Sequence, residues 1–336
     1  MKLSKYFFFF GMFLFSAGLA FAQYETKITV AQDGSGDFTT IQEAIDASKA
    51  FPDERVSVFI KNGTYREKVL VPACNTKLSL IGESAEKTIL TYDDYFDKID
   101  RGRNSTFHTY TLKVEANDFH AENLTIANTA GPVGQAVALH VSGDRCSFTN
   151  CRLLGHQDTL YTEGENSRQY FSNCHIEGTT DFIFGEATVL FEQCTIHSLS
   201  DSYITAANTP KGKPFGFVFQ ACKLTAAEGV EKVYLGRPWR DYAKVVFMNC
   251  EMGVHILPEG WANWGGTSRD QTAFYAEYQN SGEGAQGEKR ISWSHQLTKK
   301  QARQYSKEKI LAPVFADEPE TSVWTNRAVS RTTIRH

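Results

Sequence analysis

A short pattern of apolar and polar positions recurs through the middle of the chain. The pattern Phe-x-x-Cys occurs five times, and each cysteine is followed two places later by an aliphatic residue or methionine. The stretch AENLTI at 121–126 fits the same frame with Leu124 in the cysteine position. The spacing between successive positions varies from 20 to 28 residues, and the cysteines are Cys151, Cys174, Cys194, Cys222 and Cys250.

This repeat predicts a stacked, all-β architecture. An imperfect unit of this length is typical of solenoids, in which neighbouring units stack to bury one continuous core. The units contain runs such as ATVLFEQCTI and KVVFMNCEM, which are rich in β-branched and aromatic residues and are separated by Gly and Asn turns. They therefore favour a parallel β-helix. A leucine-rich-repeat horseshoe is the main alternative, but its Leu-x-x-Leu-x-Leu pattern is absent.

The cysteines are expected to form a column inside the predicted β-helix. Equivalent positions in successive coils lie about 4.8 Å apart, so the thiols can stack as small apolar fillers and the neighbouring Asn residues can form a ladder. Phe and Cys would face opposite sides of a flat strand, whereas a bend between them would let both point inward; the pattern leaves both open. Seven cysteines make an odd number. Mostly free thiols are expected, with Cys174 and Cys194 the best placed for a disulfide.

The segments outside the repeats predict two helices. TTIQEAIDASKA has a capping box formed by Thr40 and Glu43, and it would cover the open N-terminal end of the sheets. LTKKQARQYSKEKIL, at 297–311, predicts a basic surface helix. Residues 312–336 show no periodicity. We therefore expect a single domain over residues 23–315 and a C-terminal tail over residues 316–336.

The first 22 residues have the pattern of a secretory signal peptide. Lys2 and Lys5 precede a short apolar run, and Ala20-Phe21-Ala22 supplies the small residues of a cleavage site. The alternative, an uncleaved membrane anchor, is disfavoured because the run is short for a span. The mature protein is expected in the periplasm or outside the cell, without a membrane segment.

Charge and missing motifs exclude several function classes. The formal charge of −4 falls to −6 when Lys2 and Lys5 are removed, which argues against nucleic acid as a partner. No Gly-x-Ser-x-Gly motif of serine esterases is present. The acidic stretch DDYFDKID at 93–100 does not have the spacing of a calcium-binding EF-hand loop and is expected to be a solvated loop.

Four histidines lie among the repeats and are the other candidates for chemistry. They are interpreted as turn or surface residues rather than catalytic ones: His140, His156, His175 and His197. No metal or other cofactor is expected.

Two aspartates occupy the same position of the repeat. Asp158 lies seven residues after Cys151, and Asp181 lies seven residues after Cys174. If the repeat register holds for seven residues past each cysteine, the backbones of the two aspartates lie about 4.8 Å apart. Repulsion between the two carboxylates should then raise the pKa of at least one of them. Such a pair can serve as an acid and a nucleophile. Both could equally be ordinary turn residues, because Asp201 also follows Cys194 by seven.

Several short sequence motifs together resemble those of the pectin methylesterase family. GHQDTLY at 155–161 and DFIFG at 181–185 are accompanied by QAVAL at 135–139 and LGRPW at 235–239. GTYREKV at 63–69 and DGSGDFTTIQEAI at 33–45 precede them in the family's order. The resemblance runs from about residue 30 to residue 293, which is nearly the whole expected domain.

The resemblance implies a right-handed parallel β-helix that hydrolyses C6 methyl esters of pectin, a methyl-esterified galacturonan. Asp181 would be the nucleophile, and Asp158 the general acid and later the general base. Gln135 and Gln157 would donate to the oxyanion, and Arg237 would hold the nucleophile and contact substrate. No metal or other cofactor is implied.

Further positions would contact the sugar chain. Trp239 would pack against a sugar ring, and Trp264 is also expected in an exposed loop rather than in the core. Thr106, in STFHT, matches a substrate-contact position. The protein is expected to be a monomer with pectin as its partner.

Other readings of the acid pair remain open. Two carboxylates about 5 Å apart would also suit a retaining glycosidase, and β-helices host pectin-cleaving hydrolases and lyases. A pectin-binding β-helix without activity is a further alternative. The products separate them, because only the esterase releases methanol without creating new chain ends.

Overall fold

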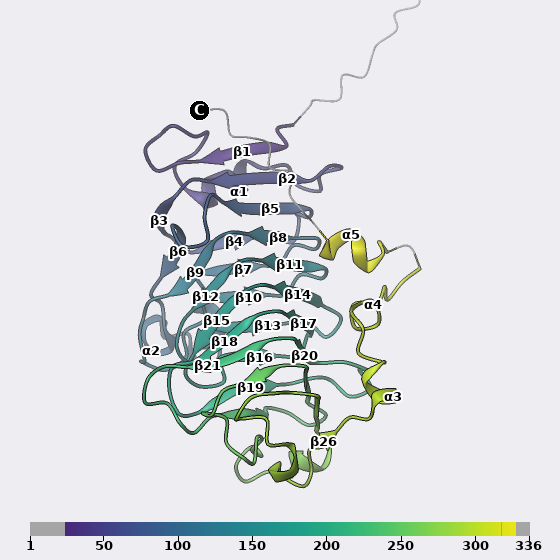
Figure 1. The fold of residues 1–336 in the computed structure, drawn as a ribbon. Coiled ribbons are helices and arrows are strands. Elements are labelled where there is room, and N and C mark those ends of the chain that lie inside the picture. Colours follow the sequence, from purple (N-terminus) through teal and green to yellow (C-terminus); the bar gives the residue numbers. More distant parts are fainter. Residues whose placement is uncertain (1–23, 317, 327–336) are drawn as a thin grey trace, which may run out of the picture.

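Three long parallel sheets form the walls of a stack of coils (Figure 1). The structure, a computed structural model, describes residues 24–316 and 318–326. Except for the first two and the last two, successive strands along the chain belong to different sheets, and strands pair in parallel with their equivalents in the next coil. The predicted parallel β-helix is therefore confirmed.

The sheets are named here by their strands. Sheet A contains β1 (Lys27–Val30), β2 (Val56–Ile60), β5 (Leu78–Gly82), β8 (His120–Glu122), β11 (Cys146–Thr149), β14 (Arg168–Ser172), β17 (Thr188–Glu192), β20 (Phe217–Gln220), β23 (Lys244–Met248), β25 (Phe274–Tyr278) and β26 (His295–Gln296). Sheet B contains β3 (Gly63–Arg66), β6 (Thr88–Tyr92), β9 (Thr125–Asn128), β12 (Arg152–Leu154), β15 (His175–Gly178), β18 (Thr195–Ser198), β21 (Lys223–Ala226) and β24 (Glu251–Met252). Sheet C contains β4 (Val69–Val71), β7 (Leu112–Val114), β10 (Leu139–Val141), β13 (Leu160–Thr162), β16 (Ile183–Gly185), β19 (Tyr203–Ala207) and β22 (Tyr234–Pro238).

A bend lets phenylalanine and cysteine of each repeat point into the same core. The residue before the cysteine adopts a positive φ, for example 50° at Asn150 and 52° at Asn173, and it turns the chain from sheet A into sheet B. Asn tolerates this left-handed conformation better than most residues, which explains its recurrence. The phenylalanines stack in one column, with centroids 4.6 Å apart for Phe148 and Phe171. Both columns are buried.

The cysteine column contains free thiols. All seven cysteines are unbridged, including Cys174 and Cys194. From Cys174 onward, each thiol in the column lies against the phenylalanine carbonyl of the preceding coil, with Cys194 Sγ 3.4 Å from the oxygen of Phe171. Burial raises the pKa of Cys146, another interior thiol, to a value that leaves it protonated. The thiols therefore fill the core rather than crosslink it. Of the hydrogen bonds expected between stacked Asn side chains, the described residues form one, in which Asn150 Nδ2 donates to Asn123 Oδ1 at 2.7 Å.

The helix α1 (Ile41–Ala47) covers the N-terminal end of the stack, as predicted. Thr40 is its N-cap and accepts a hydrogen bond from the backbone of Glu43. Its apolar face is formed by Ile41, Ala44 and Ile45, which are buried in the main core. The helix thereby removes the first coil's core from water.

The prediction of a single helix at 297–311 is wrong. The segment forms two short helices, α3 (Lys299–Ala302) and α4 (Lys307–Ile310), because each has its own N-cap, Thr298 and Ser306. A third, α5 (Thr321–Thr325), follows. Their apolar residues pack on the outer face of sheet A, with Trp324 fully buried beside Leu190.

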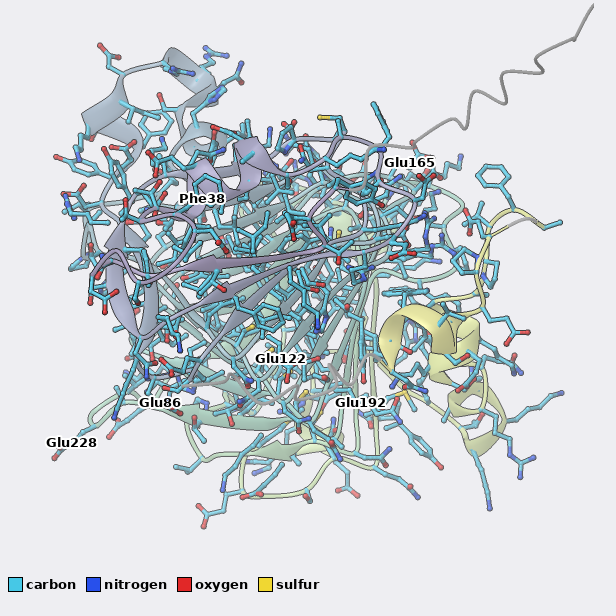
Figure 2. All side chains as sticks on the ribbon, turned by 90° about the horizontal axis from the view of Figure 1, so that it is seen from above. Phe38, Glu86, Glu122, Glu165, Glu192 and Glu228 are labelled. Carbon is cyan, nitrogen blue, oxygen red and sulfur yellow. The ribbon has the colours of Figure 1, made fainter. Side chains whose placement is uncertain are left out.

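The C-terminal segment thus contributes packing well beyond residue 315. Figure 2, which looks down on the stack, shows it along one side of the coil, the side that carries Glu192. Lys307 Nζ lies 2.9 Å from Glu192 Oε2, and Arg168 lies 2.7 Å from Glu318. These ion pairs hold the C-terminal segment against the side of sheet A. The buried Trp324 adds apolar contact area between the segment and the sheet.

The expected signal peptide, residues 1–22, lies outside the described residues. Within the described ranges, no helix is long and apolar enough to cross a membrane.

Candidate active site

One cleft on the outer face of sheet C brings together all seven residues selected from the sequence. Its volume is about 400 Å³. The selected residues that line it are Thr106, Gln135, Gln157, Asp158, Asp181, Arg237 and Trp239. Six further residues line it: Phe96, Arg103, Phe107, Phe184, Ala206 and Trp264. The motifs that carry the seven selected residues therefore converge, although these residues are spread over positions 106–239.

Asp158 and Asp181 occupy equivalent places in adjacent coils. Asp158 precedes β13 and Asp181 precedes β16, and these strands pair with Leu160 opposite Ile183. Both aspartates adopt a left-handed backbone, with φ of 67° and 49°. Non-glycine residues in this conformation are uncommon and are concentrated at functional sites. The turn places both carboxyl groups in the cleft with only 9% and 6% exposure.

Arg237 holds Asp181 in a two-point contact. Its Nε lies 3.0 Å from Oδ1 and its Nη2 lies 2.6 Å from Oδ2. The strand β22, which carries Arg237, pairs with β19 and thereby brings residues 56 positions apart into contact. A two-point contact of this kind fixes the orientation of the carboxylate as well as its charge.

Two aromatic rings clamp the guanidinium of Arg237. Its central carbon lies 4.1 Å from the ring centroid of Tyr203 and 4.2 Å from that of Trp264. Stacking on both faces limits the rotation of the arginine side chain and adds cation–π attraction. Tyr203 and Trp264 are thus positioning residues for the carboxylate that Arg237 binds.

The two carboxyl groups differ electrostatically. Burial raises the pKa of Asp158 well above its ordinary value, the charge of Asp181 raises it further, and Arg237 opposes both. Burial also raises the pKa of Asp181, against the lowering by the hydrogen bonds and charge of Arg237. Among the described residues, Arg237 donates to Asp181 and not to Asp158. These effects favour the proton on Asp158 and the anion on Asp181.

Gln135 and Gln157 lie side by side on adjacent coils. An isolated parallel bridge joins them, and the backbone oxygen of Gln135 accepts a hydrogen bond from Phe96. Within the described part of the chain, neither side-chain amide forms a hydrogen bond, and both line the cleft. Their N–H groups are therefore available to a ligand oxygen.

Aromatic side chains form the walls of the cleft. Phe184 contacts Trp239 edge-on, with centroids 5.8 Å apart. Tyr161 stacks on Phe184 at 4.7 Å and contacts Phe107 at 5.0 Å. Phe107 and Thr106 belong to the 3₁₀ helix η1 (Gly102–His108), which stands beside α2 (Phe96–Ile99). Such walls suit the faces of sugar rings, which present C–H groups to aromatic rings.

The prediction for residues 93–100 is wrong, because this stretch is not a solvated loop. It contains α2, and Phe96 lines the cleft. Asp93 pairs with Lys98 at 2.8 Å and Asp94 pairs with Lys68 at 2.7 Å, so the acidic side chains hold the helix in place. Across the described ranges, no group of three or more His, Cys, Asp or Glu residues is arranged to hold a metal ion.

The interpretation of the histidines as turn or surface residues is wrong for His140, which is buried, whereas His156, His175 and His197 are partly exposed. His140, His175 and His197 lie in β10, β15 and β18. His140 is buried, and its Nε2 lies 2.7 Å from Glu163. None of the four lines the cleft, so the structure keeps them away from the carboxyl pair.

The repeat frame also fails at Asp201. The residue opposite Asp181 in the next coil is Tyr203, whose oxygen accepts the Asp181 backbone N–H. The carboxylate of Asp201 instead accepts hydrogen bonds from the backbone of Glu231 and Lys232. Tyr203 carries no motif signal and could have been found only by knowing the length of this turn.

An anionic carboxylate beside a protonated carboxyl group and free amide donors can attack an ester and protonate its leaving group. Fold and cleft together define a β-helical carboxylic ester hydrolase.

The two remaining 3₁₀ helices of the described residues, η2 (Arg269–Gln271) and η3 (Gly287–Lys289), lie outside this cleft.

Comparison with known proteins gives the family. The Pectinesterase family model matches residues 27–313. Pectinesterase 31 of Arabidopsis thaliana is 38% identical over 294 residues, which cover 85% of this chain and 92% of that protein. The pectin methylesterase from carrot superimposes with a TM-score of 0.80 and 34% identity, covering 85% of this chain and 92% of that one. A pectin methylesterase in complex with a hexasaccharide gives 0.74 and 29%, covering 89% and 100%. The chain belongs to the pectinesterase family.

Proposed function

We propose that this protein hydrolyses the C6 methyl esters of pectin to pectate and methanol, with Asp181 as nucleophile and Asp158 as general acid and base. The observation that carries the assignment is the unequal carboxyl pair, in which Arg237 binds Asp181 while burial raises the pKa of Asp158. Family membership and the likeness to a pectin methylesterase solved with a hexasaccharide support pectin as the substrate.

In the first step, Asp181 attacks the C6 carbonyl carbon of a methylated galacturonate. Negative charge develops on the carbonyl oxygen, where the amides of Gln135 and Gln157 can donate hydrogen bonds. Collapse of the tetrahedral intermediate breaks the bond to methoxide, which is a poor leaving group. Asp158 donates its proton to that oxygen, so methanol leaves and an acyl-enzyme anhydride with Asp181 remains.

In the second step, Asp158 is ionised and accepts a proton from water as the water attacks the anhydride carbonyl. The bond to Asp181 breaks, which releases the C6 carboxylic acid and restores the Asp181 anion beside Arg237, and the acid then loses its proton to solvent. Asp158 regains the proton that the cycle began with. The same two carboxyl groups therefore serve both steps, with no serine or cysteine nucleophile.

The products test this assignment directly. Highly methylated pectin is incubated with the protein while methanol, new reducing ends and absorbance from unsaturated sugars are measured in parallel. Methanol without the other two signals is expected. New reducing ends would favour a glycosidase, and an absorbance rise would favour a lyase.

The pH dependence of kcat/KM is expected to be bell-shaped. As pH falls, Asp181 takes up a proton and ceases to be a nucleophile; as pH rises, Asp158 loses the proton that the leaving group needs. Because burial raises the pKa of both groups, both limbs should lie above the range of ordinary carboxyl groups. Initial rates of methanol release, corrected for alkaline hydrolysis without enzyme, measure this. A rate that stays level across the whole range would contradict the proposed roles.

Removal of one amide donor should slow the chemical step. In Gln157→Ala, kcat should fall by about 10²–10³-fold, because one hydrogen bond to the developing oxyanion is lost. Gln271→Ala, an exposed position outside the cleft, serves as the control and should keep full activity. Methanol release at saturating pectin measures the effect. An unchanged kcat with a raised KM would assign Gln157 to substrate binding instead.

Export and assembly remain proposals as well. The charged start, apolar run and small residues at positions 20 and 22 support removal of residues 1–22 on secretion to the periplasm or beyond. A mature domain that begins near residue 23 and acts as a monomer fits the single continuous core.

A further inference from the structure

The cleft contains a cation that the proposed reaction does not use. Arg103 lines the cleft from η1 and is exposed. Across the described ranges, Arg103 forms no hydrogen bond, ion pair or ring contact. The other arginines around the site are engaged: Arg237 with Asp181, Arg240 with the oxygen and ring of Trp239, and Arg269 with the oxygen of Pro238 and the ring of Trp264.

The charge of Arg103 is not directed at the catalytic pair. The pKa of Asp158 is set by burial, Asp181 and Arg237, and that of Asp181 by burial and Arg237. Arg103 contributes to neither. An arginine that lines a substrate cleft without balancing any protein charge there is available to an anionic group of the ligand.

The backbone that carries Arg103 is fixed. Ser105 Oγ donates to the oxygen of Gly102 at 2.9 Å and accepts from the backbone N–H of Arg101 at 2.8 Å. Two residues after Arg103, Ser105 is itself fully buried, and Phe107 packs on Tyr161. The guanidinium therefore extends from a rigid turn at the cleft, and ordering it on a ligand costs side-chain entropy only.

We propose that Arg103 binds the free C6 carboxylate of an unesterified galacturonate next to the residue whose ester is hydrolysed. This inference rests on the proposed pectin esterase function and assigns Arg103 as a specificity-determining residue. Methyl esters are neutral, so the only anions along a pectin chain are its unesterified units. Each hydrolysis creates such a carboxylate, and the enzyme should therefore favour esters beside sites it has already processed.

The test compares two substrates and three variants. Initial rates of methanol release give kcat/KM on fully methylated pectin and on pectin with about half of its esters removed. Arg103→Gln is compared with Arg103→Lys, which keeps the charge, and with Arg101→Gln. Arg101 is also exposed but does not line the cleft, so its replacement matches the loss of charge on the same turn.

Arg103→Gln should lower kcat/KM about five-fold on the partly de-esterified pectin, which is the range for an exposed ion pair, and leave fully methylated pectin unaffected. Arg103→Lys should keep most of the preference for partly de-esterified over fully methylated pectin, and Arg101→Gln should keep all of it. Inhibition by unesterified hexagalacturonate should weaken about five-fold in Arg103→Gln, and added salt should reduce the difference.

Equal losses on both substrates would make Arg103 a general sugar contact and overturn the proposal. The same change in Arg101→Gln would also overturn it, because net charge alone would then explain the effect. These failures leave methanol release by the unaltered protein intact. Absence of methanol release from either pectin would instead overturn the proposed function, and this inference with it.

Discussion

Asp181→Ala should abolish methanol release, with a loss of at least about 10⁴-fold in kcat. The variant lacks the atom that forms the acyl-enzyme, and no other described carboxylate is held by Arg237. Asp158 cannot replace it, because it is needed as the acid. Methanol release from highly methylated pectin over long incubation measures the residual rate.

The fold should survive this substitution. Asp181→Ala removes a buried carboxyl group whose ionisation burial disfavours, while Arg237 stays clamped between Tyr203 and Trp264 and is partly exposed. The thermal midpoint should therefore change little. Asp201→Ala is the matched control, an aspartate of the neighbouring coil whose carboxylate accepts only backbone hydrogen bonds outside the cleft. Retained turnover in Asp181→Ala, or loss in Asp201→Ala, would contradict the assignment.

Asp158→Asn should also fail in catalysis while still binding pectin. The amide has nearly the same shape but cannot donate a proton to methoxide or accept one from water, so kcat should fall by about 10²–10⁴-fold. Asn removes no sugar contact supplied by the aromatic walls or by Arg103. Methanol release and equilibrium binding to pectin are measured on the same preparation.

Binding provides the discriminating readout for Asp158. An affinity for pectin within about three-fold of the unaltered protein, together with the lost turnover, is the result expected of a general acid. If affinity fell in parallel with kcat/KM and kcat stayed high, Asp158 would be a binding residue. The leaving-group chemistry would then require another acid.

The sequence predicted the coil and its register over Asp158 and Asp181 because both depend on the core. Phe148, Phe171 and their equivalents must stack on one another, so the repeat spacing reports the coil length directly. The same spacing failed at Asp201, because the residue that pairs with Ile183 is Thr205, which lies eleven residues after its cysteine, whereas Ile183 lies nine after Cys174. Turns between sheets lie outside the core and can change length without disturbing it.

The C-terminal helices show the same limit. The apolar pattern of residues 297–311 fits one helix, yet Leu297 and Ala302 contact one part of sheet A while Ile310 and Leu311 contact another. The break between α3 and α4 lets both groups reach the sheet. Docking on an existing surface, and not helix propensity, decided this segment.

The sequence by itself determined the β-helix, the acid pair and, through its motifs, seven of the residues that line the cleft. These follow from local periodicity and from short words whose residues act close to their own strands. The tertiary structure alone decided that Tyr203 and Trp264 contact Arg237 and that Arg103 lines the cleft without a partner among the described residues. Tyr203 begins β19, whereas Arg103 and Trp264 lie in long connections between strands, and only the closed coil brings all three to one face of sheet C.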